Sequence, residues 1–314
     1  FEVSSFVRSV TSWTMSMASE PPSLAQTYMR GPLIPHGHGK PLSKEELDGL
    51  REELAAIKKE FGMVEPERAF MDEKDVEWRF GGPPDYTIAN LYYLKGKTKN
   101  HPPGSLEMIV ENLVKTWEME RSHKLDPNKH RSVDPKTFHI SANGGKKFNN
   151  DEANKIGNYN VLLQSCPVEL YDVDRINWEQ SHDKFHSAFA AFPWELLEVF
   201  SPPPRVSFSW RHWGHFTGSY EGKEGDGRLI EMYGFGVAVV NDKLQLTDVD
   251  IYYKPEPFIQ ALRGIGDSCS TWHGTDVLGE GATSHCPFVE KQKRTGFKAG
   301  ECPVRKAKTE QVKL

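Results

Sequence analysis

The sequence of 314 residues contains no run of about 18 apolar residues, which excludes a conventional membrane-spanning helix. Cysteine is scarce: the four residues, at positions 166, 269, 286 and 302, are widely spaced and form no CxxC pair. Structural zinc motifs and a disulfide framework are therefore not expected. His36 and His38 lie in a segment rich in glycine and proline, where we expect solvated side chains and no metal site.

Basic charge and nucleotide-binding motifs are missing as well. The formal net charge of −5 gives none of the basic bias that nucleic-acid-binding chains carry. The sequence has no GxGxxG, GxxxxGK[ST] or GxSxG motif, and no cysteine in a recognisable nucleophile motif. These absences argue against nucleotide-binding folds and the common hydrolases, so we expect no nucleic-acid partner and no nucleotide cofactor.

Two cellular locations fit the sequence. Sparse cysteines favour a reducing compartment, so we predict a cytoplasmic protein. Residues 1–17 are rich in serine and threonine and contain Arg8, which resembles the remnant of a transit peptide. Residence in an organelle after cleavage of that peptide is the alternative.

The segment Val206–Pro255 carries the strongest structural signal. It holds three strand-like runs, with Asn241–Asp242 as a predicted two-residue turn before the last run. In the first run, period-two alternation places Trp210 and His212 on one face and Trp213 on the other. A strand that is aromatic on both faces favours a curved sheet that closes around something.

Two long helices are predicted before these strands. Ser43 and Glu46 form a capping box for a helix over residues 43–61. We expect its apolar stripe to pack on the domain that follows, and a partner-binding helix is the alternative. A second helix, over residues 105–124, has a predicted buried stripe that includes Ile109 and ends at Trp117.

The remaining pattern is α+β. A hairpin is expected at residues 137–148, and helices at 150–164, 178–200 (broken at Pro193) and 256–263. Helices around a long meander predict a strongly curved antiparallel sheet forming a cone packed on helices, with N- and C-terminal extensions. We divide the chain into an irregular N-terminal segment (1–42), a helical extension (43–75), the main domain (76–263) and an irregular basic C-terminal tail (264–314).

Several segments, in the same order along the chain, resemble a known family. They include WRFGGPPDY (78–86), ISANGG (140–145), SHDKFHSAF (181–189), RHWGHFTGSYEG (211–222) and YGFGVAVVNDKLQLTDVDIYY (233–253). The resemblance is to the plant and fungal "pathogen-related protein" group, in the SnoaL-like branch of the NTF2-like superfamily, and it covers residues 76–263. It implies a cone-shaped sheet around an apolar pocket. Relatives that are enzymes use acid–base residues without metal or organic cofactor.

The sequence departs from the SnoaL-like pattern at two places. Relatives often end the last strand with an aspartate before proline, where this chain has Lys254 before Pro255. The usual turn histidine is displaced by one position to His215, which moves it to the other strand face. The family's chemistry is therefore not expected here in the same form.

His212 and Asp250 are the predicted catalytic residues. Histidine suits proton transfer because its unperturbed pKa of about 6.5 lies near the working pH. A carboxylate in an apolar cone would have a raised pKa and could shuttle a proton. Asp248 shares a strand face with Asp250, so the hypothesis is that one of them faces the cavity. A solvent-facing pair, or partners for Arg211 and Lys254, are the alternatives.

Other pocket residues are predicted from the same strands and the second helix. Trp117 and Trp210 would shape an apolar wall, and Tyr233 and Tyr252 could donate hydrogen bonds to a developing oxyanion. Glu118 lies at the rim of the Trp117 stripe, where it could reach the pocket or pair on the surface.

Three functions stay open at this point. The first is a pocket protein for a small apolar molecule, with cofactor-free cyclisation, isomerisation or dehydration if it is an enzyme. The second is a non-catalytic binding module in a stress or defence setting. The third is an accessory subunit that docks through its extensions, as a homodimer or with a partner protein. The sequence alone does not decide whether the chain is an enzyme.

Overall fold

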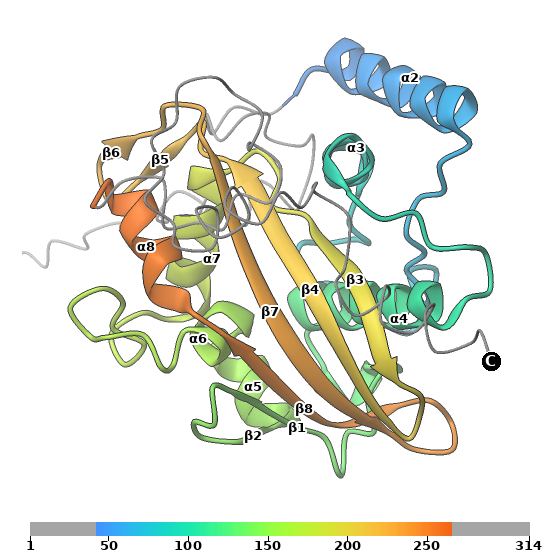
Figure 1. Ribbon diagram of the computed structural model, residues 1–314, viewed down its shortest axis with the longest axis vertical. Coiled ribbons are helices and arrows are strands. Elements are labelled where there is room, and N and C mark those ends of the chain that lie inside the picture. Colours follow the sequence, from blue (N-terminus) through green and yellow to red (C-terminus); the bar gives the residue numbers. More distant parts are fainter. Residues whose placement is uncertain (1–41, 266–314) are drawn as a thin grey trace, which may run out of the picture.

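The computed structural model describes residues 42–265. Within this range, a six-stranded sheet in the order β2-β1-β8-β7-β4-β3 curves around a group of helices (Figure 1). The expected α+β cone is therefore confirmed. The strands of the sheet are β1 (His139–Ala142), β2 (Phe148–Asn149), β3 (Trp194–Ser201), β4 (Arg205–His215), β7 (Leu229–Val240) and β8 (Leu246–Tyr253). A separate small hairpin pairs β5 (Ser219–Tyr220) with β6 (Lys223–Glu224).

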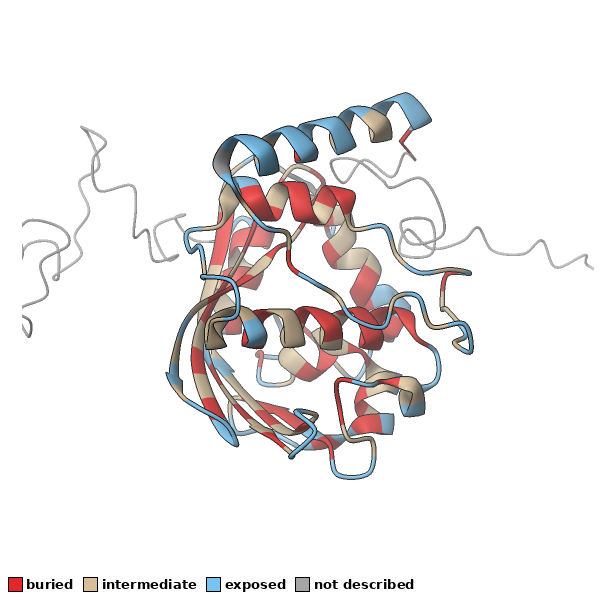
Figure 2. Cartoon of the chain, turned by 90° about the vertical axis from the view of Figure 1, so that its right-hand side faces the viewer, coloured by how far each residue is buried: buried red, intermediate tan, exposed pale blue. Residues whose placement is uncertain are grey.

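Helices fill the concave side of the sheet and cover one end of it. The helices on the concave side are α4 (Leu106–His123), α5 (Asn150–Ile156), α6 (Asn158–Leu162) and α7 (Trp178–Ala188). The others are α2 (Lys44–Phe61), α3 (Thr87–Gly96), the 3-10 turn η1 (Pro127–Lys129) and α8 (Pro255–Arg263), the last at the predicted place of the closing helix. Figure 2 shows α2 as the outermost layer, exposed along its outer side, with the buried α3 beneath it.

Strand β4 buries both of its faces, as its aromatic alternation predicted. Phe208 and Trp210 belong to the core on the concave side of the sheet. Trp213, on the opposite face, packs against Leu91 and Leu94 of α3. The sheet therefore has no fully solvated face along the inner part of β4.

The first helix begins and packs as predicted. The Ser43 hydroxyl accepts a hydrogen bond from the Glu46 backbone, and the Glu46 carboxylate accepts one from the Ser43 backbone at 2.7 Å. Gly62 ends the helix in the left-handed conformation at φ 62°. Leu54 is buried in one cluster with side chains of α3, so the helix packs on the domain that follows.

Residues 194–201 correct one prediction, because they form strand β3 instead of a helix. Trp194 pairs with His212, and Leu196 pairs with Trp210, both on β4. This pairing and the complete burial of Leu196 outweigh the weak helical preference of a short segment. The helix before it ends at Ala188, ahead of Pro193.

Two details of the sheet also differ from expectation. β1 runs parallel to β8, with Ile140 opposite Val249, so the sheet is mixed and not wholly antiparallel. The connection between β7 and β8 spans residues 241–245, where a two-residue turn was predicted. The Asn241 side chain accepts hydrogen bonds from the backbones of Lys243 and Gln245, which closes this longer loop.

Helix α4 is buried differently from the predicted stripe. Ile109 is 49% exposed, whereas the charged side chains of Glu120 and Lys124 are fully buried. Glu120 accepts hydrogen bonds from Lys124 Nζ at 2.8 Å, from the Arg131 backbone at 2.8 Å, and from the Ser132 backbone and hydroxyl at 2.9 and 2.6 Å. The helix passes through the interior of the molecule, where polar side chains are stable only with partners.

Candidate functional site

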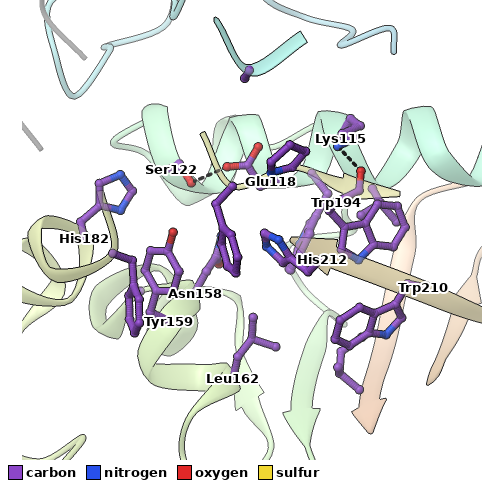
Figure 3. Close-up of a pocket in the computed structure, with 18 of the residues that line it drawn as sticks. Lys115, Glu118, Ser122, Asn158, Tyr159, Leu162, His182, Trp194, Trp210 and His212 are labelled. Carbon is purple, nitrogen blue, oxygen red and sulfur yellow. Dashed lines mark hydrogen bonds between the residues drawn. The ribbon is translucent and has the colours of Figure 1, made fainter. Parts of the chain in front are cut away.

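A cavity of about 270 Å³ lies between the concave face of the sheet and helices α4, α6 and α7 (Figure 3). Its walls are mostly aromatic and aliphatic, and a smaller number of polar side chains project into it. The wall residues discussed below are Lys115, Trp117, Glu118, Ser122, His123, Tyr159, Leu162, Trp178, His182, His186, Phe192, Trp194, Phe208, Trp210 and His212.

The sheet contributes the aromatic wall. Phe208, Trp210 and His212 alternate along β4 and face the cavity, as the period-two pattern predicted for this strand. Tyr253 on β8 lies beside Trp210, with ring centroids 5.6 Å apart. The structure thus places Trp210 and His212 in the pocket, together with Trp117 of α4.

His212 is held by stacking and kept uncharged. Its ring lies on that of Phe192, with centroids 3.8 Å apart. Burial, together with the positive charge of Lys115, lowers its pKa to about 3, and a hydrogen bond with the Pro193 backbone opposes the change. An imidazole with that pKa is neutral at pH 7, so it can both donate and accept hydrogen bonds.

Two histidines of α7 extend the polar part of the cavity. His182 and His186 are four residues apart, so they lie on one helix face, and their rings are 4.2 Å apart. His182 also stacks on Trp178, with centroids 4.5 Å apart. Burial lowers the pKa of His186 to about 4 and that of His182 as well. Neither was predicted, although their spacing in SHDKFHSAF is the signal that could have found them.

Helix α4 adds a carboxylate and an amine. Glu118 lines the cavity and accepts a hydrogen bond from Ser122 at 3.3 Å, so the interpretation that it pairs on the surface is not supported. Lys115, one turn earlier on the same helix, is buried and donates a hydrogen bond to the Trp194 carbonyl at 2.5 Å. Figure 3 shows Glu118 and His212 projecting into the same space from opposite walls.

Several buried polar atoms at the cavity have no hydrogen-bond partner within residues 42–265. They include the indole nitrogens of Trp117 and Trp210, Nδ1 of His212 and Nε2 of His182. A buried polar group without a partner is costly, commonly about 1–3 kcal/mol.

Four predicted pocket residues do not line the cavity, which corrects their placement. On β8 the apolar Val249 and Ile251 face inward, so Asp248, Asp250 and Tyr252 face the convex side. Tyr233 of β7, also outside the cavity wall, lies opposite Arg211 in the strand pairing.

The two aspartates have structural partners on the convex side. Asp250 accepts a hydrogen bond from the Ser141 hydroxyl at 2.5 Å. Asp248 pairs with Lys147 at 2.7 Å. Tyr252 is 45% exposed. The geometry therefore gives none of these side chains access to a molecule bound in the cavity.

Residues 42–265 contain no group of three or more histidine, cysteine, aspartate or glutamate side chains arranged to hold a metal ion. None of the helices in this range is long and apolar enough to cross a membrane. Cys166 is a buried free thiol whose pKa burial raises to about 11. His36, His38 and the other three cysteines lie outside the described residues.

Comparison with known proteins identifies a relative and similar folds. No family model matches the chain. A solved structure assigned as a SnoaL-like polyketide cyclase, from Jannaschia sp. CCS1, is 10% identical with a TM-score of 0.28, over 54% of this chain and 99% of that one. An NTF2-like protein of unknown function from Exiguobacterium sp. 255-15 is 9% identical with a TM-score of 0.23, over 48% and 86%. These two similarities concern the fold alone.

The sequence relative is closer. A "Pathogen-related protein" from Hordeum vulgare is 33% identical over 212 residues, which make up 66% of this chain and 90% of that protein. The aligned region covers nine-tenths of the relative's length. The chain belongs to the pathogen-related protein family.

Proposed function

We propose that the chain binds a small, mostly apolar molecule in the cone cavity and can transfer a proton on that molecule without a cofactor. The observation that carries the proposal is the combination of aromatic walls with a few polar side chains that line the cavity, among them Lys115, Glu118 and His212. A ligand with an apolar body and one or two oxygen atoms would suit this lining. Such a pairing of apolar walls and few convergent polar groups is typical of small-molecule sites.

Glu118 and His212 are the groups suited to proton transfer. Because the lowered pKa keeps His212 neutral, it is better placed to donate a hydrogen bond to a carbonyl than to hold a proton. Glu118 projects from the opposite wall with Ser122 beside it, so its carboxylate takes the role of base that we had assigned to Asp250.

Non-catalytic binding is the second candidate, and the cavity histidines favour it. His123, His186 and His212 all have pKa values far below neutral pH, and a group with such a pKa is a poor proton carrier at pH 7. In this alternative the same cavity holds a ligand in a stress or defence setting. The name of the Hordeum vulgare relative points in that direction.

The binding proposal is tested with 3-phenylpropanol, an apolar alcohol, by isothermal titration calorimetry. We expect saturable binding to the full chain. Leu162→Trp fills the cavity from α6 and should weaken binding at least about tenfold, since the added ring occupies the ligand's volume. Leu125→Trp, at a partly exposed position outside the cavity wall, is the matched control. Absence of binding to the unaltered chain would contradict the proposal.

Proton transfer is tested with the ketone 4-phenylbutan-2-one in deuterated water. If the chain is catalytic, exchange of the protons beside the carbonyl, followed by NMR, should be faster with protein than with buffer alone. Glu118→Gln should remove most of the acceleration, whereas Glu169→Gln, at an exposed position, should not. Binding without any acceleration would support the non-catalytic candidate.

A further inference from the structure

We propose that Lys115 is a covalent site, whose amine forms a reversible imine with the carbonyl carbon of an aldehyde or ketone held in the cone cavity. The inference rests on the proposed function to the extent that a small molecule must enter the cavity. It adds a chemical class to that molecule: an apolar body that carries an aldehyde or ketone group.

Lys115 places a buried amine beside the cavity. The residue lies on α4, is 6% exposed and lines the cavity. Its Nζ donates to the carbonyl of Trp194 at 2.5 Å and lies 4.9 Å from the ring centroid of Tyr93. Trp194, whose carbonyl accepts this hydrogen bond, also lines the cavity, so a molecule bound there lies close to the lysine (Figure 3).

Lys124, which immediately follows α4, provides a contrast. Both lysines are buried, but Lys124 forms ion pairs with Glu120 at 2.8 Å and Glu73 at 2.7 Å. Lys115 forms no ion pair with any carboxylate of residues 42–265. A buried amine without a carboxylate partner is readily deprotonated.

The electrostatic environment supports this contrast. Burial, together with the positive charge of Arg68, lowers the pKa of Lys115 to about 8, and the negative charges of Glu111 and Glu118 oppose the change. About a tenth of the amine is then neutral at pH 7, compared with less than about a thousandth for a solvated lysine. Only the neutral amine has the lone pair that attacks a carbonyl.

The reaction balances with groups already at the site. The lone pair of Lys115 forms a bond to the carbonyl carbon, the π electrons move to the oxygen, and one proton passes from nitrogen to oxygen to give a carbinolamine. Protonation of its hydroxyl then releases water and leaves a protonated imine. Glu118, three residues later on the same helix face, can take the proton that the Lys115 ammonium loses before the attack and return it to the departing hydroxyl.

The test uses 3-phenylpropanal with sodium cyanoborohydride, which reduces an imine to a stable secondary amine. The full chain is treated briefly at pH 7, digested, and the labelled fraction of each lysine is measured by mass spectrometry. We expect Lys115 to be labelled at least about tenfold more than the exposed Lys146 and the ion-paired Lys124, because of the three only Lys115 lines the cavity that holds the aldehyde, and its neutral fraction exceeds that of a solvated lysine. An excess of 3-phenylpropanol, which fills the cavity but has no carbonyl, should protect Lys115 alone.

The outcomes separate this inference from the proposed function. If 3-phenylpropanol binds but Lys115 is labelled no more than Lys146, the imine is excluded and the binding proposal stands. If the alcohol does not bind and Lys115 is not labelled, both fail. Lys115→Arg keeps the charge but cannot form an imine, so it should bind the alcohol and lose the selective label. If this variant does not fold, the labelled fraction of each lysine in the unaltered chain still decides whether Lys115 forms the imine.

Discussion

The indole ring of Trp210 on β4 lies directly over Gly234, its cross-strand partner on β7. A Cβ atom at residue 234 would overlap this ring and approach the backbone oxygen of Tyr252. Phe208 lies over Gly236 in the same way. The YGFGV sequence of β7 therefore makes room for two aromatic rings of β4, and through them it shapes the cavity wall.

Gly234→Ala is expected to destabilise the protein by about 1–3 kcal/mol, because the added methyl group displaces Trp210 in a closely packed core. It should also weaken binding of 3-phenylpropanol. Urea unfolding and calorimetric titration measure the two effects.

Gly49→Ala is the control, since an added Cβ there meets nothing within 4 Å and the residue lies inside α2. That change should stabilise by up to about 1 kcal/mol. Equal stability of Gly234→Ala and the unaltered chain would contradict this account of the wall.

Arg211 is a buried cation held between two carboxylates. Its guanidinium lies 2.9 Å from Glu195 and 2.5 Å from Glu231, and all three side chains are at least nine-tenths buried. Arg211→Met should cost about 3–5 kcal/mol, because it leaves two buried carboxylates without their partner. Lys147→Met removes a half-exposed partner of Asp248 and should cost less than about 1 kcal/mol. Denaturant unfolding compares the two, and similar losses would contradict the role assigned to Arg211.

Strand β4 could be predicted from the sequence because the alternation of its side chains is a local pattern. Alternation along β4 depends only on strand geometry, so it placed Trp210, His212 and Trp213 on their correct faces without knowledge of the neighbours. The partners of Arg211 could not be found in this way. Glu195 lies on β3, which the sequence favoured as a helix, and the pairing with β4 brings the two side chains together.

The cavity could be predicted only in part. Asp248 and Asp250 were chosen for their chemistry, but the apolar cavity takes the alternate residues Val249 and Ile251 of β8. Glu118 reaches the interior because α4 is buried on more than one side. An apolar stripe in the sequence indicates only one buried face of a helix. His182 and His186 lie on a helix that was predicted, but the sequence did not indicate which face of that helix is buried.

Buried histidines should make the fold sensitive to acid. Folding lowers the pKa of His123 and His212 from 6.5 to about 3, mainly through burial. The unfolded chain therefore binds more protons than the folded chain between about pH 3 and 6.5. The contribution of these neutral, buried histidines to the free energy of unfolding is fully present above pH 6.5, and it is lost as the pH falls below that value. At pH 5 each such histidine should have lost about 1–2 kcal/mol.

His212→Phe isolates one of these contributions. Phenylalanine can keep the stack on Phe192 but cannot bind a proton, so the variant should lose less stability between pH 7 and pH 5 than the unaltered chain, by about 1–2 kcal/mol. Denaturant unfolding at the two pH values measures the difference. His139→Gln, at an exposed position on β1, should leave the pH dependence unchanged. If His212→Phe shifts stability equally at both pH values, the imidazole is not held neutral by the cavity. His212 would then be available as a base, and the case for Glu118 in that role would be weakened.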